Sequence, residues 1–402
     1  MDAQPSTDEL TQFISELFTI EDITLGDHRQ GFVARYRGML KGTDSESAFN
    51  KVKDKMDSLG LLPILRPDGE RQELLLVKAP EHKKKTRLWI NLVLFIATFI
   101  SVLFAGALYS ATSDPFTSPL DLQAIARFLW SGWPFAVSFM AILATHEFGH
   151  YLVGRLHRVK VTLPYFIPFP FSMIGTMGAF INMKEPPRNK KHMLDIAMAG
   201  PLAGLIVTIP VLIIGLSLST VEPIPAVIPE GLGFQIEGNS ILYLLLKYLE
   251  FGRLLPQPAS YGNIGTVLYW LRYFFTGTPL PLGGLDVMIH PVAWAGWAGL
   301  LITSLNLIPA GQLDGGHIFH VLFSRKGSKI ALWVIVITLA ALGFAWNGWW
   351  LWVMLILFFG RGHAEPLDQV TPLDNRRKIL AAVMLVIFIL IFMPVPLLVI
   401  AG

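Results

Sequence analysis

Two histidines and a glutamate lie close together in one apolar stretch, His146-Glu147-Phe148-Gly149-His150. Side chains at positions i and i+4 share one face of an α-helix, so His146 and His150 can bind a single metal ion. Glu147 follows the first histidine and can reach a water molecule beside the metal, which is the arrangement of zinc hydrolases. A pair of core histidines with a buried acid is the alternative. We favour the metal site, because three polar groups inside an apolar, membrane-length helix are costly to bury.

A catalytic zinc ion needs a third protein ligand and one position for water. The sequence has no cysteine, so the third ligand must be His, Asp or Glu. Three acids of the apolar body fit less well. Asp286 begins its segment at the opposite side of the membrane, and Glu185 lies in a basic, proline-rich loop. Asp195 lies at the right depth, but a carboxylate in the first turn of a helix commonly interacts with the helix dipole.

Asp314 is the acid that we predict as the third ligand. It follows a segment that is broken by Pro309 and Gly311 just short of the cytoplasmic boundary. Irregular backbone at that depth is tolerated only inside protein or beside a cavity. His317, three residues further on, could be a ligand or could hydrogen-bond to one. An interfacial histidine without such a role is an equal alternative.

The composition indicates a membrane protein with a soluble head. The chain has 402 residues, of which 53% are hydrophobic and 15% charged, whereas soluble domains carry about 25% charged residues. Nearly half of the charged residues lie within the first 87 positions. A net charge of +3 is too small to indicate nucleic-acid binding. We therefore expect the lipid bilayer as a partner and no nucleic acid.

Six apolar segments are long enough to cross a membrane: Leu88–Ser110, Phe128–Val153, Met193–Leu218, Val287–Ile308, Ile330–Gly360 and Ile379–Ile400. The fifth has Asn347-Gly348 in its middle, so one long tilted helix or a hairpin of two short helices would fit. Basic residues on both sides of it favour the hairpin, which gives about seven spans.

The loops alternate in charge as the positive-inside rule requires. The basic cluster Lys83–Arg87 places the N-terminal head in the cytoplasm, and Asp114 and Asp121 mark the next loop as external. Gly154–His192 is strongly basic and therefore cytoplasmic, whereas Ser219–Gly284 is acidic and external. In the external loop we expect an interfacial cap with two apolar stretches, Ile241–Phe251 and Gly265–Phe275.

The first 82 residues are typical of a small α+β domain. The pattern predicts strands and one helix, the helix capped by Asp44 or Ser45 and closed by Gly60; the predicted strands are Phe32–Leu40, Leu61–Leu65 and Glu73–Val77. Nothing in this head looks catalytic. A regulatory partner could bind there, and a folded appendage without such a role is at least as good an interpretation.

The cytoplasmic stretch Val159–Met183 is rich in proline, glycine and aromatic residues, and its end has strand-like composition. A hairpin or re-entrant strand here could present an edge to which an unwound substrate segment adds as a further strand. An ordinary membrane-surface loop packed by its aromatic side chains is an equal alternative.

The motifs resemble those of the site-2 protease family of intramembrane zinc metalloproteases. The similar stretches are His146–His150, Ala199-Gly200-Pro201-Leu202-Ala203-Gly204 in the next span, and Asn306–Gly316 at the end of a later one. The head, Gly175–Ala179 and Gly311–Gly316 resemble the branch that contains chloroplast proteases needed for thylakoid development and their bacterial relatives. The catalytic motifs cover roughly residues 128–317. Gln312-Leu313-Asp314-Gly315 departs from the Asn-Pro-Asp-Gly of many relatives but keeps the ligand.

The resemblance implies one zinc ion per chain on His146, His150 and Asp314, with Glu147 as the catalytic base. It also implies that Asn306 holds the scissile peptide or its oxyanion. The implied reaction is hydrolysis of peptide bonds within or near transmembrane segments of substrate proteins, as in regulated intramembrane proteolysis.

Three other functions remain as alternatives. A prenyl-protein endopeptidase would need a glutamate as third ligand from a later helix, and no Glu occurs between Glu250 and Glu365. A membrane metal transporter would need polar residues through several spans to the outer face. A catalytically inactive regulatory relative is disfavoured by the intact Glu147.

We thus expect a polytopic α-helical membrane protein with a small N-terminal α+β soluble domain and a short membrane-associated β segment. The expected regions are a cytoplasmic head (1–82), a basic linker with the first transmembrane helix (83–127), the intramembrane metalloprotease core (128–323) and C-terminal transmembrane helices (324–402). The N-terminus lacks a signal peptide and a transit peptide, which favours a bacterial plasma membrane over a thylakoid.

Overall fold

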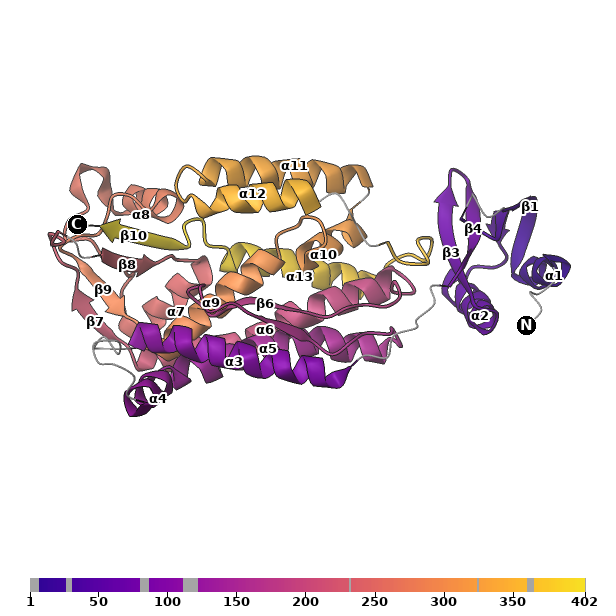
Figure 1. Cartoon of the computed structure of the whole chain (residues 1–402). Helices are drawn as coiled ribbons and strands as arrows, with labels where there is room; N and C mark the ends of the chain where they lie inside the picture. Colours follow the sequence, from indigo (N-terminus) through magenta and orange to yellow (C-terminus); the bar gives the residue numbers. More distant parts are fainter. Residues whose placement is uncertain are drawn as a thin grey trace.

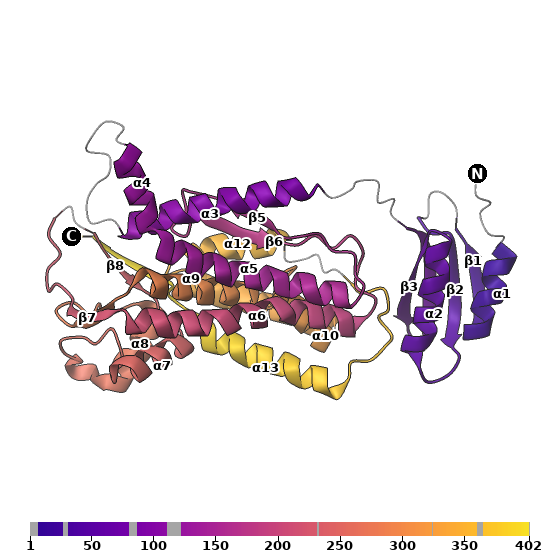
Figure 2. The ribbon, with the colours of Figure 1, turned by 90° about the horizontal axis from the view of Figure 1, so that it is seen from below.

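Long helices run side by side in this protein, and a small unit of helices and strands lies beyond one end of them (Figures 1 and 2). The computed structural model describes residues 7–26, 31–79, 87–110, 122–230, 233–323, 325–359 and 365–401. Lys83, Lys84 and Lys85 of the basic cluster and the external-loop residues Asp114 and Asp121 lie outside these ranges, so the structure does not test the topology that they indicated.

Two helices of the described residues are long and apolar enough to cross a membrane, α3 (Leu88–Ser110) and α6 (Lys190–Ser217). A third crossing is possible if α4 (Leu122–Ser131) and α5 (Trp133–Leu156), which meet at a bend of 50°, form one span. The helices α9 (Pro291–Asn306) and α13 (Asn375–Ile391) are shorter. The number of seven spans therefore stays a prediction.

The helices α5, α6 and α9 form the centre of the helical body, and α10 (Asp314–Leu322) packs on α6. Their facing surfaces are apolar, and Phe139, Leu212 and Leu300 are completely or almost completely buried there. This core surrounds the metal-site candidates and fixes the three helix segments that carry them.

Two apolar segments differ from the simple spans that were expected. Over its described residues, the fifth apolar segment is a hairpin of α11 (Arg325–Leu342) and α12 (Gly348–Phe359), the arrangement that the flanking basic residues favoured. The prediction that Ile379–Ile400 is one helix is wrong: α13 ends at Ile391, and β10 (Leu397–Ala401) pairs antiparallel with β8 (Gly233–Glu237). Pro394 and Pro396 lie between α13 and β10, and proline lacks the N–H that a continuing helix would need.

The N-terminal unit is a four-stranded antiparallel sheet with two helices; its elements are α1 (Thr7–Leu17), β1 (Phe18–Leu25), β2 (Ala34–Leu40), α2 (Ser45–Ser58), β3 (Leu61–Asp68) and β4 (Arg71–Lys78). The side chain of Asp44 caps α2 by accepting a hydrogen bond from the Ser47 amide at 3.1 Å. Ile14, Tyr36 and Met56 are completely buried between the helices and the sheet. Helix α1 and strand β1 are additions to the elements predicted from the sequence.

A short segment between α12 and α13, residues 365–371, joins this unit to the helical body, and we call it the strap. Leu367 inserts into the core of the N-terminal unit, and its carbonyl accepts a hydrogen bond from the Leu65 amide at 2.8 Å. On its other edge, the Leu367 and Asp368 amides donate to carbonyls of residues 187 and 188, just before α6. The strap therefore connects β3 to the start of α6.

The opposite end of the helical body carries short strands and two helices (Figure 1), namely β7 (Thr220–Pro223), β8, α7 (Ile241–Phe251), α8 (Gly265–Thr276), β9 (Leu285–Met288) and β10, with a 3-10 turn at Gly262–Ile264. This end contains a buried polar cluster. Lys247 and the Tyr243 hydroxyl both donate to the Glu237 carboxylate, at 3.3 and 3.1 Å. Asp286 on β9 is 2% exposed, and its carboxylate accepts a hydrogen bond from the Val287 amide.

The buried Asp286 gives a prediction about pH and stability. Burial and, less strongly, the nearby Glu237 carboxylate raise the pKa of Asp286 to about 7, against the opposing effect of Lys247. Between its ordinary pKa and the raised value, the folded state holds a proton that the unfolded state releases, so stability falls as pH rises through that window. We expect the thermal unfolding midpoint to decrease as the pH is raised from about 5 to about 7. The substitution Asp286→Asn should remove that part of the pH dependence of the midpoint.

Glu222→Gln is the matched control, since Glu222 is the exposed partner of Asp286 on the neighbouring strand β7. It should leave the pH dependence of the midpoint as in the wild type. An Asp286→Asn protein with the full wild-type slope would contradict the prediction.

Candidate metal centre

Three of the predicted site residues converge between helices. The Nε2 atoms of His146 and His150 on α5 lie 3.2 Å apart. The Oδ2 atom of Asp314, the first residue of α10, lies 3.5 Å from Nε2 of His146 and 3.2 Å from Nε2 of His150. His146 and His150 are 3% and 7% exposed. The structure thus brings together residues that are more than 160 positions apart in the sequence.

The break between α9 and α10 positions the carboxylate. α9 ends at Asn306, and Pro309 and a left-handed Gly311 (φ 58°) turn the chain before α10 starts at Asp314. A carboxylate in the first turn of a helix is stabilised by the unpaired amides and the dipole at that end. The turn at Pro309 and Gly311 is the irregular backbone that the sequence predicted just before Asp314.

A backbone carbonyl of α6 orients one of the two histidines. Nδ1 of His150 lies 2.7 Å from the carbonyl oxygen of Ile196. Because a carbonyl can only accept, Nδ1 carries the proton, and in the neutral ring Nε2 presents a lone pair to Asp314. Metal-binding histidines are usually held in this way by a second hydrogen bond.

A close approach between α5 and α6 explains part of the glycine-rich stretch Ala199–Gly204. A Cβ atom added at Gly200 would lie 2.0 Å from Nε2 of His150, and one added at Gly204 would lie 3.2 Å from Nδ1 of His146. In the sequence this stretch stood out only as part of the family resemblance. Its physical role, to leave room for the imidazole rings, depends on which helix lies opposite.

The three donor atoms fit a zinc ion. Zinc bonds of about 2.0–2.1 Å place neighbouring ligands of a tetrahedral site about 3.4 Å apart, and the three separations here are 3.2, 3.2 and 3.5 Å. The facing Nε2 of His150 and carboxylate of Asp314 are both acceptors, so a cation between them is favourable. Two nitrogen donors and one oxygen donor leave one tetrahedral position for water or substrate.

A cavity of about 230 Å³ opens beside the three donors. Glu147 and Asn306 line it together with the metal-site residues, and its other walls are mainly apolar, formed by Ala179, Phe180, Ile181, Met183, Pro187, Met193, Ile196, Ala197 and Leu313. Glu147 is 5% exposed. Nδ2 of Asn306 lies 3.4 Å from Nε2 of His146. All five predicted site residues therefore border one space.

The other candidate ligands lie elsewhere or have other contacts. Asp195 bonds to His157 and Arg377, and Glu185 pairs with Lys160 at 2.6 Å. Asp286 belongs to the polar cluster at the opposite end of the helical body. His317 lines the cavity and is not among the three grouped donor atoms.

Comparisons with known proteins agree with this geometry. The profile described as Peptidase family M50 matches residues 134–343. The chain is 29% identical to the rice (Oryza sativa subsp. japonica) protein named probable zinc metalloprotease EGY1, chloroplastic, over 92% of this chain and 64% of the relative. It is 28% identical to the Arabidopsis thaliana EGY1 protein, over 95% and 69%, and 27% identical to the Arabidopsis EGY2 protein, over 90% and 60%. The chain thus spans about two thirds of these relatives. No solved structure matches it significantly.

Substitutions at the two glycines of α6 test the packing of the site. Gly200→Ala would force a methyl group into the His150 ring, so we expect loss of stoichiometric zinc binding by the purified protein. Gly204→Ala makes a contact that needs only a shift of a few tenths of an ångström and should weaken binding much less. Metal content after dialysis, measured by atomic emission, checks both. Equal zinc content in the Gly200→Ala and wild-type proteins would contradict the arrangement.

Proposed function

Because the chain belongs to peptidase family M50, we propose that it is an intramembrane zinc metalloprotease that cleaves peptide bonds within or near transmembrane segments of other proteins. The resemblance to the site-2 proteases that the motifs indicated is confirmed by this family match. The observation that carries the proposed activity is the convergence of His146, His150 and Asp314 beside Glu147 in one largely buried cavity.

His146, His150 and Asp314 would hold the metal, one ion per chain. A bound zinc ion supplies a Lewis acid that polarises a peptide carbonyl and lowers the pKa of water to about 7. Glu147 accepts a proton from the attacking water and can return it to the departing amine. The mainly apolar walls of the cavity restrict bulk water around this carboxylate, while the open side lets water reach it.

Asn306 is proposed to stabilise the oxyanion. Its amide lies at the end of α9, borders the same cavity as Glu147, and carries two N–H donors. A preorganised donor aimed at the developing charge contributes roughly 2.7–4 kcal/mol in other hydrolases.

The hairpin of residues 165–180 supports the proposed capture of an extended substrate. β5 (Tyr165–Pro168) and β6 (Thr176–Phe180) form a two-stranded antiparallel sheet. Within the described part of the chain, β6 pairs with β5 alone, and its residues Ala179 and Phe180 line the cavity. An unwound segment of a transmembrane protein could add to the free edge of β6 and present its backbone to the metal centre.

A metal transporter is less well supported than a protease. The predicted ligand atoms all lie within 4.8 Å of one another, and the core of the helical body is formed by buried apolar side chains such as Phe139 and Leu212. Thr208 is a polar residue inside that core, but its hydroxyl donates to the Gly204 carbonyl of its own helix and so does not indicate a polar path through the core.

The apolar helices and the family indicate a membrane protein. The relatives above are named chloroplastic. A bacterial plasma membrane in place of a thylakoid, a cytoplasmic head and a regulatory partner on that head stay predictions.

Glu147→Gln tests the proposed chemistry directly. Glutamine keeps the volume and the packing of the side chain but cannot accept the proton, so cleavage of single-span membrane proteins in proteoliposomes should fall by at least about 10²-fold. Zinc content should stay at one ion per chain. Cleavage at the wild-type rate by Glu147→Gln would show that Glu147 is not the base.

Asn306→Ala is expected to lower kcat by about 10²–10³-fold with a smaller change in KM, because the lost bond forms mainly in the transition state. Asn306→Asp has nearly the same shape but replaces the donor by an anion and should be at least as impaired. Steady-state cleavage of the same substrates measures both. Wild-type kcat in Asn306→Asp would argue against an oxyanion role.

A further inference from the structure

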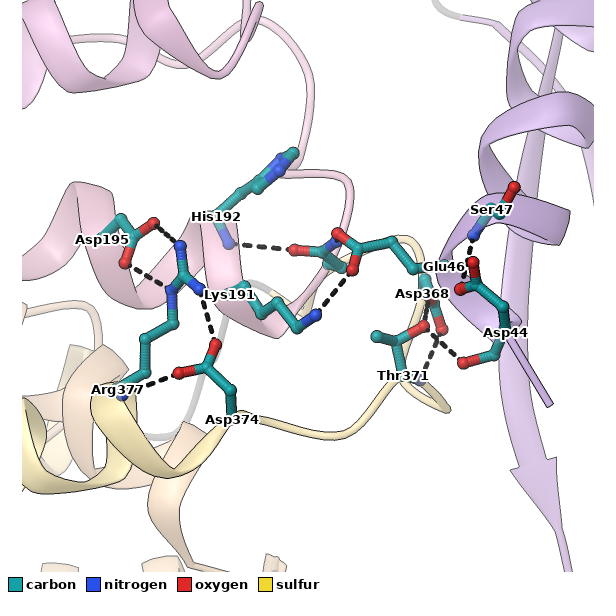
Figure 3. A network of polar contacts seen from close by, with 12 residues as sticks. Asp44, Glu46, Ser47, Lys191, His192, Asp195, Asp368, Thr371, Asp374 and Arg377 are labelled. Atoms are coloured by element: carbon teal, nitrogen blue, oxygen red, sulfur yellow. Dashed lines mark hydrogen bonds and ion pairs between the residues drawn. The ribbon is translucent and has the colours of Figure 1, made fainter.

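An ion-pair cluster joins the ends of three helices, and Figure 3 shows two of its members, Asp195 and Arg377. Nε of Arg377 donates to Oδ1 of Asp195 at 2.8 Å, and Nη2 donates to Oδ2 at 2.6 Å. Nε2 of His157 lies 2.9 Å from the same Oδ2 atom. The Asp195 side chain is thus held on both oxygens, and only 18% of it is exposed.

The three residues of this cluster belong to different helices. Asp195 lies in the second turn of α6, His157 is the C-cap of α5, and Arg377 lies in the first turn of α13. A bidentate guanidinium–carboxylate pair fixes orientation as well as distance. The cluster therefore fixes α6 relative to α5, the helix that carries both histidines.

The residue after Asp195 contacts the metal centre. The carbonyl of Ile196 accepts the hydrogen bond from Nδ1 of His150, and Ile196 is 4% exposed. The fixed carboxylate and the orienting carbonyl thus belong to consecutive residues of one helix. A small shift or rotation of this turn of α6 would lengthen the bond to His150 and free its ring to turn.

We propose that Asp195 is a positioning residue of the metal centre: through its bonds to His157 and Arg377 it fixes the Ile196 carbonyl, which sets the orientation and the tautomer of His150. The inference rests on the proposed zinc site. It gives Asp195, which the sequence analysis had weighed as a direct ligand, an indirect role in metal binding.

Asp374 offers a matched control. Its carboxylate also bonds to Arg377, with Nη1 at 2.6 Å, but Asp374 is the N-cap of α13, and among the described residues its hydrogen bonds go to α13 and not to α6. Asp374→Asn therefore removes a charge from the same arginine and leaves the contact between Asp195 and His157 in place. Lys191→Met is a second control, because it removes the ion pair of α6 with Glu46 of the N-terminal unit.

The test measures zinc dissociation constants by chelator competition on the purified full-length proteins. Loss of a side chain that orients a metal ligand typically weakens binding by about 10–100-fold, which is the effect expected for Asp195→Asn. Both controls should stay within about 3-fold of the wild type. The visible spectrum of the cobalt-substituted Asp195→Asn protein should also change, because the His150 ring turns, whereas the spectra of the controls should not.

The outcomes separate this inference from the proposed function. Wild-type protein without a zinc site would overturn both. Wild-type zinc affinity and cobalt spectrum in Asp195→Asn would overturn the positioning role alone, even if its thermal unfolding midpoint is lowered. Asp374→Asn or Lys191→Met proteins that lose as much affinity as Asp195→Asn would mean that general loosening of the helix ends is the cause, which also overturns it.

Discussion

The arrangement of the helical body follows from one constraint, which is that two imidazoles and a carboxylate must be held together inside an apolar core. Such groups are costly to bury unless their lone pairs are satisfied. His150 satisfies one ring nitrogen with the Ile196 carbonyl and directs the other at Asp314. The break after α9 brings Asp314 to the same depth as the histidines of α5. Binding of a divalent cation by these three donors would compensate for their burial and would leave a position at which chemistry can occur.

Helix α6 connects this centre with the rest of the molecule. Gly200 leaves room for the His150 ring, Ile196 orients it, and Asp195 ties the helix to α5 and α13. At its start, α6 contacts the N-terminal unit, since Glu46 accepts hydrogen bonds from Asn189 and Lys191 (Figure 3). The strap lies against the same segment. The position of α6 thus depends on contacts with both the helical body and the N-terminal unit.

The residues that the sequence marked as a candidate site lie together in the structure, whereas many of the contacts around them could not be predicted. The spacing of His146 and His150 belongs to one helix, and depth together with the local context of each carboxylate selected Asp314 among four acids. The contact of Leu367 with the N-terminal core, the pairing of β10 with β8 and the bonds of Asp195 to Arg377 join residues far apart in the chain. No periodicity or local motif encodes such contacts. The helix α1 could have been found, because Leu10, Phe13 and Ile14 recur at helical spacing after an acidic first turn.

The central claim is that His146, His150 and Asp314 hold a zinc ion. X-ray absorption at the zinc edge of the purified protein tests it most directly. We expect one zinc per chain, with two imidazole nitrogens and additional oxygen ligands at about 2.0–2.2 Å, and the loss of this shell in Asp314→Ala. A shell without two imidazoles, or one that is unchanged in Asp314→Ala, would contradict it.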